Sequence, residues 1–291
     1  MTTVGKITNF IQWADSMKDE RTADWLFVSS PVPTLAMTLV YLLYVKWIGP
    51  KMMENQKPFN LKYPLVLYNV ALTILNFYIF KELVLGAIDA GYSFPCQPLV
   101  YDKDPKHIRI AAAVWWYYFS KVIEFIDTVF FVLRKKDEQI SFLHVYHHAT
   151  MPFLWWIGVK WVPGGQSTYA APINAFVHVV MYMYYGLSAL GPEYQKYLWW
   201  KKYLTQLQLF QFFFALIHST HSWYTDCPFP GWMYAALNLY LVSFIFLFGN
   251  FYLQAYIRKQ RLYCKVKLED HSNGKQIKNG HLTNGVDKKI N

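Results

Sequence analysis

Charged residues are scarce in this chain of 291 residues. Only 16% of its residues are Asp, Glu, Lys or Arg, whereas a typical soluble domain carries about 25%. The sequence is instead 54% hydrophobic and 20% aromatic, with 23 Tyr, 22 Phe and 12 Trp. Several long stretches have almost no charge, so the composition predicts an all-α protein that crosses a membrane several times. The same composition excludes intrinsic disorder for all but the ends of the chain.

Cysteine is also scarce. Three Cys in a chain of this length exclude a small secreted module that disulfides hold together. The N-terminus has no basic segment followed by an apolar core, so the sequence predicts no cleavable signal peptide. We therefore expect the first apolar span to direct membrane insertion itself.

Seven apolar stretches are candidates for transmembrane helices. A helix needs about 20 residues to cross the hydrocarbon core, so the first and fourth stretches must use flanking residues as well. The predicted spans are residues 33–47, 63–85, 108–133, 140–159, 169–190, 203–224 and 233–256.

The distribution of basic residues predicts the orientation of these spans. A net charge of +10 could indicate nucleic-acid binding, but the basic residues stand in short clusters between the spans. If the N-terminus is luminal, the cytosolic segments hold 19 of the 28 Lys and Arg residues and the luminal segments hold seven. This asymmetry follows the positive-inside rule and predicts a luminal N-terminus, a cytosolic C-terminus and no nucleic-acid partner.

The orientation divides the chain into three parts. We expect a luminal segment at 1–32, a membrane domain at 33–257 and a polar, disordered cytosolic tail at 258–291. The tail ends in KKIN, where Lys288 and Lys289 match a dilysine retrieval signal. A basic pair can also end a basic tail by chance. Combined with a cytosolic C-terminus, the pair predicts the endoplasmic reticulum membrane.

Two cysteines fall on the predicted luminal side. Cys96 follows the second span and Cys227 follows the sixth. An oxidising lumen favours a disulfide between them. The alternative is two unpaired thiols.

Ionisable side chains within the spans mark candidate sites, because such groups are costly in a membrane. The first set is His144, His147 and His148 in HVYHH, which share one helix face at i, i+3 and i+4. Three imidazoles on one face can bind a metal or act as nucleophile and acid/base. The alternative is a set of histidines that hydrogen-bond only for packing.

The second candidate set lies in KVIEFIDT. Lys121 and Glu124 can pair at i, i+3, which leaves Asp127 available to orient a neighbouring histidine. The alternative is an ion-pair network that only holds the helices together.

The third set is Asn174 and His178, one turn apart on one helix face, with Tyr182 one turn further on. A lone histidine in a span is often only a core residue whose hydrogen bonds are made within the bundle. His178 becomes a functional candidate because we expect it to lie near the first set.

The fourth set is the pair of amides Gln208 and Gln211, followed by His218 and a more peripheral His221. Amides in a bundle often only join helices. If spans three to six pack together, however, these polar stripes face one interior with aromatic walls, which suits a reaction chamber. The basic clusters RKK at 134–136 and KK at 201–202 would rim its cytosolic mouth and suit a phosphate-bearing substrate, although positive-inside flanking also explains them.

These motifs, KVIEFIDT, HVYHH, NAFVHVVMYMYY and TQLQLFQ, resemble those of the very-long-chain fatty acid elongases, which are condensing enzymes. The resemblance covers about residues 25–258, and the HxxHH pattern within FLHVYHH is its most specific part. The flanking FFVLRKK, WWIGVKWVPGGQ and YLWWKKYLTQLQ are similar to the branch that prefers polyunsaturated and very long chains.

The resemblance implies a very-long-chain 3-oxoacyl-CoA synthase that condenses acyl-CoA with malonyl-CoA and releases CO2 and CoA. It implies seven membrane helices, six of which form an inverted-barrel-like ring around an acyl tunnel. It also implies a ping-pong route in which His147 accepts the acyl group, His144 and His148 assist, and His178 acts on malonyl-CoA. No metal or redox cofactor is implied. The residues expected to bind or orient substrate are Lys121, Glu124, Asp127, Asn174, Tyr182, Gln208 and Gln211.

The partners implied by the resemblance are acyl-CoA, malonyl-CoA and membrane lipid. A homo-oligomer and association with a 3-oxoacyl-CoA reductase and a 3-hydroxyacyl-CoA dehydratase are expected by the same analogy. Two alternatives remain. A membrane di-iron desaturase or hydroxylase would need about eight ligands in three histidine boxes, and only one HxxHH is present. A seven-helix receptor or lipid transporter would leave the embedded histidines, lysine and carboxylates unexplained.

Overall fold

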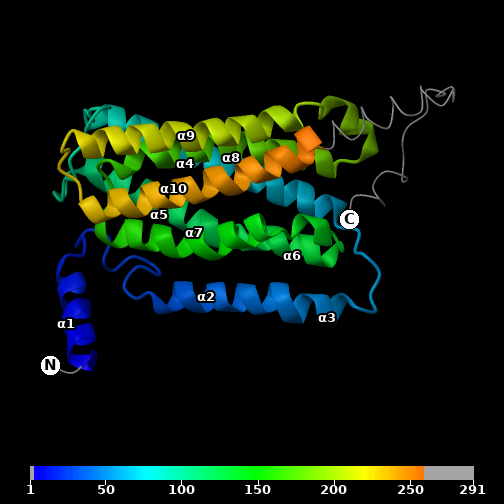
Figure 1. Ribbon diagram of the computed structural model, residues 1–291, viewed down its shortest axis with the longest axis horizontal. Helices are drawn as coiled ribbons and strands as arrows, with labels where there is room; N and C mark the ends of the chain where they lie inside the picture. Colours follow the sequence, from blue (N-terminus) through cyan, green and yellow to red (C-terminus); the bar gives the residue numbers. More distant parts are fainter. Residues whose placement is uncertain (1–2, 259–291) are drawn as a thin grey trace. The chain divides into compact units, whose positions relative to one another are not determined.

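The computed structural model describes residues 3–258, and over this range it contains helices and no β-strand. The predicted tail beyond residue 258, with Lys288 and Lys289, lies outside the described residues. Figure 1 follows the helices along the chain. They are α1 (Thr3–Ser16), α2 (Val32–Leu43), α3 (Gly49–Met53), α4 (Lys62–Asp89), α5 (Pro105–Ile123), α6 (Phe125–Leu133), α7 (Phe142–Trp161), α8 (Ser167–Ala189), α9 (Lys201–Tyr224) and α10 (Gly231–Tyr252), with short π or 3-10 turns at Tyr44–Ile48, Asp137–Gln139, Pro192–Tyr197 and Leu253–Arg258.

Each predicted span falls on one helix or on one run of consecutive helices. Three segments, Val32–Met53, Lys62–Asp89 and Gly231–Arg258, are long and apolar enough to cross a membrane. The other four predicted spans fall on α5 with α6, α7, α8 and α9, which carry the polar candidate sets. These three helical segments indicate a membrane protein. That the other four predicted spans also cross the membrane stays a prediction.

The chain divides into two units at Ile245. The second unit contains the C-terminal end of α10 and the π turn Leu253–Arg258. The residues of the candidate site all belong to the first unit.

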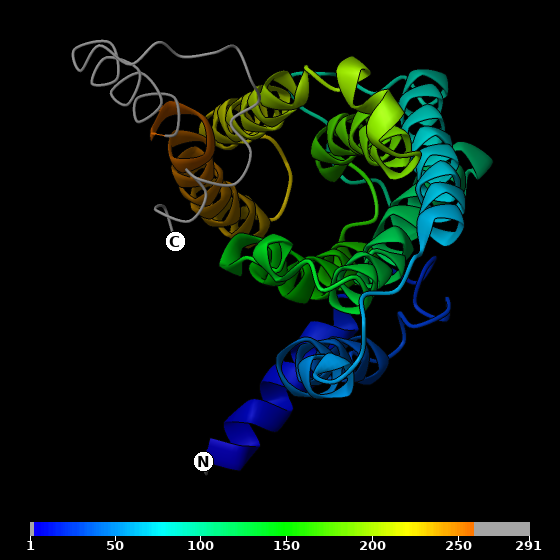
Figure 2. The same cartoon turned by 90° about the vertical axis from the view of Figure 1, so that its right-hand side faces the viewer.

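Within the first unit, helices contact one another in a definite order. α9 packs on α8, α8 on α4, α4 on α5 and α5 on α7. α10 joins α9 through the stacked rings of Phe212 and Phe244, whose centroids are 5.3 Å apart. It joins α7 through a 3.1 Å hydrogen bond between the hydroxyls of Tyr146 and Ser243. Figure 2 shows these helices end-on, with α2 outside them against α7. This order brings the helices that carry the candidate sets together.

The core lies where α5 meets its neighbours. Aromatic and β-branched side chains of α5 fill the centre, and Tyr117, Tyr118 and Val114 are almost completely buried. The small residues Ala171 and Ala175 of α8 are also fully buried there, because small side chains let helices approach closely. The packed core fixes α5, the helix that positions Lys121.

The C-terminal end of α1 and the segment that follows it, residues 14–29, are attached to α5 and α7 through tryptophan indoles. Three indole N–H groups donate to backbone carbonyls of residues 14–29, a common use of the polar edge of a tryptophan. The bonds run from Trp115 to Leu26 at 3.0 Å, from Trp156 to Phe27 at 3.0 Å and from Trp161 to Ala14 at 2.7 Å.

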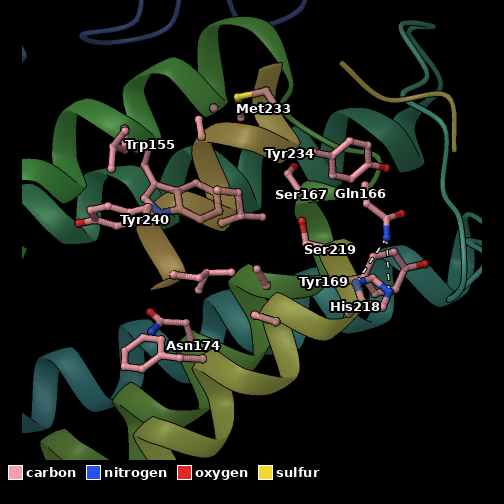
Figure 3. A pocket seen from close by; sticks show the side chains of 18 of the residues that line it. Trp155, Gln166, Ser167, Tyr169, Asn174, His218, Ser219, Met233, Tyr234 and Tyr240 are labelled. Carbon is pink, nitrogen blue, oxygen red and sulfur yellow. Dashed lines mark hydrogen bonds between the residues drawn. The ribbon is translucent and has the colours of Figure 1, made fainter. Parts of the chain in front are cut away.

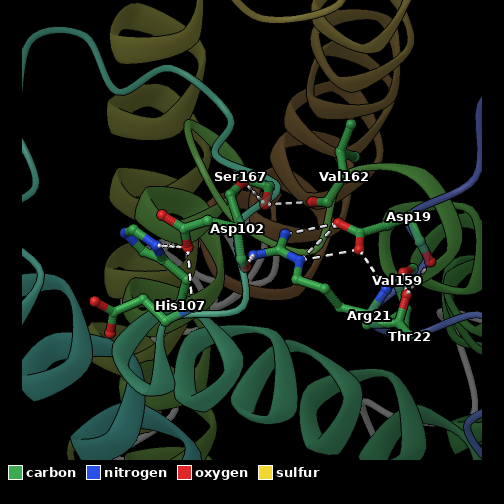
Figure 4. Close-up of polar contacts among 10 residues, drawn as sticks. Asp19, Arg21, Thr22, Asp102, His107, Val159, Val162 and Ser167 are labelled. Carbon is green, nitrogen blue, oxygen red and sulfur yellow. Dashed lines mark hydrogen bonds and ion pairs between the residues drawn. The ribbon is translucent and has the colours of Figure 1, made fainter.

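A buried ion pair strengthens this attachment (Figure 4). The Arg21 guanidinium donates to both carboxylate oxygens of Asp19, at 2.9 and 2.6 Å, and both side chains are almost fully buried. Arg21 also donates to the backbone carbonyl of Asp102 at 3.3 Å, and Thr22 donates to that of Val159 at 2.7 Å. The adjacent His107 holds the pKa of the Asp102 carboxyl below its usual value by hydrogen bonding to it. We call the residues 14–29 with these contacts the N-terminal clasp.

A disulfide joins Cys96 and Cys227, whose Cα atoms are 5.5 Å apart. It connects the loop after α4 to the turn between α9 and α10. Both loops were predicted to face the lumen.

Candidate active site

The three histidines of HVYHH lie in the first two turns of α7. Ser141 caps this helix, and its hydroxyl accepts a hydrogen bond from the backbone N–H of His144 at 3.3 Å. The ring centroids of His144 and His148 are 4.2 Å apart, and those of His147 and His148 are 5.0 Å apart. We call His144, His147 and His148 the histidine cluster.

A buried ion pair on α5 faces a histidine of α8. Lys121 Nζ donates to Glu124 Oε1 at 2.6 Å, and each side chain is 1% exposed. His178 Nδ1 lies 3.3 Å from Lys121 Nζ and 3.3 Å from Glu124 Oε1. Lys121 Nζ also lies 4.6 Å from the centroid of the Tyr117 ring, in cation–π range. This arrangement places a buried ammonium next to an imidazole and a carboxylate.

The histidine cluster and the group of Lys121, Glu124 and His178 lie close to each other inside the helical bundle. The ring centroids of His147 on α7 and His178 on α8 are 6.3 Å apart, and the His147 ring also packs 5.6 Å from Phe244 of α10. Since His148 and His178 are almost fully buried, these imidazoles lie in a region shielded from bulk solvent. A substrate carbon placed between His147 and His178 would be in reach of both helices.

Thr128 provides the hydrogen-bond partner of His144. Its Oγ1 lies 2.7 Å from His144 Nε2 and 3.2 Å from the Tyr41 hydroxyl of α2. Thr128 comes seven residues after Lys121 and four after Glu124, on the same face of the helical run, although our sequence analysis gave it no role. Tyr41 had no signal at all, because it stands in an apolar span without a polar pattern.

Asp127 forms a hydrogen bond with a tyrosine of α8. The Tyr182 hydroxyl donates to Asp127 Oδ2 at 2.9 Å, and the Tyr182 ring packs 5.9 Å from that of His178. The sequence suggested that Asp127 orients a histidine. In the structure Thr128 bonds His144, Glu124 lies beside His178, and Asp127 fixes Tyr182.

The predicted amides separate into different places. Asn174 accepts a hydrogen bond from the Tyr117 hydroxyl on α5. Gln208 donates to Met181 Sδ on α8 at 3.6 Å. Gln211 is 5% exposed, and its Oε1 is buried without a hydrogen-bond partner. Among the residues described, no group of three or more His, Cys, Asp and Glu side chains is arranged to hold a metal ion.

An apolar cavity of about 160 Å³ starts at the histidine cluster. His147, Asn174 and Gln211 line it together with apolar and aromatic side chains of α7 to α10. Figure 3 shows Trp155, Tyr240 and Asn174 towards one end of the cavity, and Gln166, Tyr169 and His218 at the other. We call the first the reactive end and the second the distal end.

Polar groups at the distal end bond to the loop that carries Cys96. Gln166 Oε1 accepts from the backbone N–H of Gln97 at 2.9 Å, and Gln166 Nε2 donates to Ser222 Oγ at 2.6 Å. His218 Nε2 lies 2.8 Å from the carbonyl oxygen of Phe94. The disulfide therefore holds a loop whose residues contact the distal end, far along α9 from Gln208.

Comparisons with known proteins agree on one family. The model of the family described as "ELO: GNS1/SUR4 family" matches residues 26–263, which include every candidate residue on α5 to α9. Very long chain fatty acid elongase 4 of Homo sapiens is 50% identical over 287 residues, which are 99% of this chain and 88% of the relative. The Mus musculus protein of that name is 51% identical over 279 residues, 96% and 86% of the two chains. Very long chain fatty acid elongase 7 of Drosophila melanogaster is 47% identical over 272 residues, 92% and 83% of the two chains.

Proposed function

Since the chain belongs to the ELO (GNS1/SUR4) family and is a fatty acid elongase, we propose that it catalyses the condensation that opens each elongation cycle. A long-chain acyl-CoA, with a preference for polyunsaturated chains, reacts with malonyl-CoA to give a 3-oxoacyl-CoA, CO2 and CoA. The observation that carries this proposal is His147, which lines the apolar cavity and faces His178. An iron-dependent desaturase or a receptor would not belong to this family.

The first step transfers the acyl group to His147. The imidazole nitrogen attacks the thioester carbonyl carbon, a C–N bond forms, the C–S bond breaks and CoA leaves as a thiolate that takes up a proton. Covalent catalysis of this kind divides one difficult reaction into two easier ones. The hydrogen bond between Thr128 and His144 supports a fixed geometry of the histidine cluster, because the ring centroid of His144 lies 4.2 Å from that of His148.

The second step uses the side chains around Lys121. The C–C bond to the malonyl carboxylate breaks and CO2 leaves. The freed electron pair forms the new C–C bond to the acyl carbonyl carbon, while the C–N bond to His147 breaks and the imidazole nitrogen keeps that electron pair and takes up a proton from solvent. Lys121 and His178 position the malonyl group, and the Lys121 ammonium stabilises its negative charge in a site of low dielectric. Gln211 lines the cavity and no donor bonds its amide oxygen; after rotation of the amide, its NH2 group binds a thioester oxygen. Neither step needs an external oxidant or reductant, so we propose a reaction without a metal or redox cofactor.

The apolar cavity receives the acyl chain. Its aromatic walls exclude water, which protects an acyl-imidazole from hydrolysis. The proposal therefore extends to seven membrane helices, six of them around this tunnel, with Asn174, Tyr182 and Gln208 as supports of its walls. The contact between Tyr117 and Asn174 supports that role.

The proposed setting is the endoplasmic reticulum membrane with a cytosolic C-terminus. The excess of basic residues on one side of the spans and the KKIN ending support it. The rim clusters at 134–136 and 201–202 would bind the phosphates of CoA. A 3-oxoacyl-CoA reductase and a 3-hydroxyacyl-CoA dehydratase, which process the product, are the partners that we propose, alongside a homo-oligomer.

An acylation experiment tests the mechanism. Purified protein in detergent is incubated with a long polyunsaturated acyl-CoA alone and analysed by intact mass and peptide mapping. We expect an added acyl mass on the peptide with His147, its absence in His147→Ala and its presence in the matched control His221→Ala, since His221 is exposed on α9. Malonyl-CoA should discharge it as 3-oxoacyl-CoA. Product without any adduct would overturn the acyl-histidine step, and neither adduct nor product would overturn the proposed function.

A further inference from the structure

Two hydroxyl groups at the distal half of the cavity lack a hydrogen-bond partner. Ser219 on α9 is 3% exposed and Tyr234 on α10 is 2% exposed. The Ser219 Oγ and Tyr234 Oη atoms are both buried without a partner, and both residues line the cavity. A buried hydroxyl without a partner is unfavourable, because it has lost its hydrogen bonds to water. Two such groups beside one cavity require an explanation.

The polar side chains Gln166, Tyr169 and His218, which line this end of the cavity, have hydrogen-bond partners. The Gln166 amide bonds Gln97 and Ser222, as described above. The Tyr169 hydroxyl donates to the carbonyl of Ser93 at 2.6 Å. Ser222 donates to the carbonyl of His218, one turn back in its own helix, at 2.9 Å. Ser219 has the same opportunity to bond the carbonyl four residues before it, as serines in helices commonly do, yet its hydroxyl makes no such bond.

Helix geometry places the two hydroxyls away from the reactive end. Gln211 neighbours Phe212, which stacks on Phe244 beside His147. Ser219 comes eight residues, or about 12 Å, further along α9 and lies on the same face as Gln211. Tyr234 stacks with Trp223, one turn beyond Ser219, with ring centroids 6.1 Å apart. In Figure 3 Ser219 and Tyr234 lie on the side of the cavity where Gln166 and His218 are found.

A hydrocarbon chain in the cavity could not hydrogen-bond to the hydroxyls of Ser219 and Tyr234. The same cavity is lined by apolar residues such as Phe229, Trp232 and Leu237. A hydroxyl on a ligand can donate to or accept from either group, since serine and tyrosine hydroxyls both donate and accept. Each group therefore offers a partner to an alcohol oxygen in an otherwise apolar chain.

We infer that the distal half of the cavity recognises an acyl chain that carries a hydroxyl group far from its thioester, through Ser219 and Tyr234. The inference rests on the proposed function, because the chain reaches this point only if its thioester is at His147. It adds hydroxyacyl-CoA, with the hydroxyl at or near the methyl end, to the substrate classes of the enzyme.

Competition between matched substrates tests the inference. Wild-type protein receives pairs of saturated acyl-CoAs of equal length, one unsubstituted and one hydroxylated at its terminal carbon, over a series of lengths. We expect kcat/KM for the hydroxylated chain to be about tenfold higher at the length that reaches Ser219, which is the effect of about one net hydrogen bond. A hydroxyl moved to the middle of the chain should lose this advantage.

Variants then assign the preference to the two residues. Ser219→Ala, Tyr234→Phe and the double variant should reduce the ratio of the two kcat/KM values towards one or below it. Tyr224→Phe is the matched control, because Tyr224 is 87% exposed near the end of α9, and its ratio should equal that of the wild type.

Equal kcat/KM values for both chains at every length in the wild type would overturn the inference and would indicate that water satisfies the two hydroxyls. The condensing activity would stand in that case, because the unsubstituted chains would still be elongated. Elongation of neither chain would instead contradict the proposed function. A preference that survives the double variant would also overturn the assignment to Ser219 and Tyr234.

Discussion

The hydroxyl of Thr128 links three helices through one oxygen atom. It contacts His144 of the histidine cluster and Tyr41 of α2, and Thr128 itself stands on α6. A histidine whose ring nitrogen is hydrogen-bonded has a restricted ring orientation. Thr128 is therefore a positioning residue for the histidine cluster and touches no substrate in the proposed route.

The variant Thr128→Val tests this role, because it removes the hydroxyl and keeps the branched shape. We expect kcat to fall about 3- to 10-fold, the effect of one net hydrogen bond, while KM for acyl-CoA changes little. Thr128→Ser should restore kcat. Thr73→Val serves as control, since the Thr73 hydroxyl bonds only the carbonyl of Asn69 in its own helix. A kcat of Thr128→Val equal to that of wild type would show that His144 needs no such partner.

The pair of Lys121 and Glu124 affects stability as well as chemistry. Loss of one member of a buried ion pair leaves an uncompensated charge and costs about 3–5 kcal/mol. We expect Lys121→Met to lower the melting temperature in detergent markedly. The double variant Lys121→Met/Glu124→Leu should recover part of that loss and remain inactive.

The exposed pair of Lys136 and Glu138, 3.9 Å apart, is the control for this cycle, since Lys136→Met should cost less than about 1 kcal/mol. Thermal unfolding of Lys121→Met, Glu124→Leu, their double variant and the control Lys136→Met decides the matter. A double variant that melts below both single variants would contradict the assignment of an ion pair and would indicate a packing role for each side chain.

At the level of helices, the sequence predicted most elements within a few residues and missed two local features. The first span was predicted to end at residue 47 with the use of flanking residues, and the helical run in fact continues to Met53. The π turn Tyr44–Ile48 carries the helix past this point, and the Gly49 N–H bonds the Tyr44 carbonyl five residues back. The break at Glu124 between α5 and α6 was also missed, because the apolar pattern continues through it.

The disulfide is the element-scale feature with the clearest consequence for stability. It closes a loop of 131 residues between Cys96 and Cys227, and in the chain-entropy model such a loop contributes about 4–5 kcal/mol. We expect Cys96→Ser/Cys227→Ser to lower the melting temperature clearly. Cys264→Ser, at the remaining cysteine, should leave it unchanged. Equal melting temperatures for all three proteins would show that the bond adds nothing to the helix contacts.

For the whole molecule, periodicity and motif spacing predicted which side chains are candidates, but not which of them meet. The i, i+3, i+4 spacing predicted that the three histidines share a face, and their rings do lie together. The contact of Tyr41 with Thr128 joins residues 87 positions apart, and that of Tyr117 with Asn174 joins residues 57 apart. Such contacts depend on how the helices pack, which one sequence without coordinates does not reveal.

The proposed location is a property of the whole chain and is tested at its end. The variant Lys288→Ala/Lys289→Ala should shift the protein from the endoplasmic reticulum to later compartments, as seen by microscopy and by surface labelling. Activity in isolated membranes should not change, because these residues are far in sequence from the histidine cluster. Lys265→Ala/Lys267→Ala in the same tail is the matched control. A reticular pattern for the KKIN variant would contradict the retrieval signal.

The N-terminal clasp has a consequence for the time course of synthesis. The backbone carbonyls of residues 14–29 accept hydrogen bonds from the indoles of Trp115, Trp156 and Trp161. The ribosome adds the last of these tryptophans more than a hundred residues after the segment. At about 5–20 residues per second, the segment waits on the order of 10 s for its last partner. Cys227 is synthesised 131 residues after Cys96, so the disulfide is delayed by a similar time. One of the earliest parts of the chain to be synthesised is thus among the last to reach its final contacts, and a nascent chain that stalls before α7 would leave this segment without its indole partners.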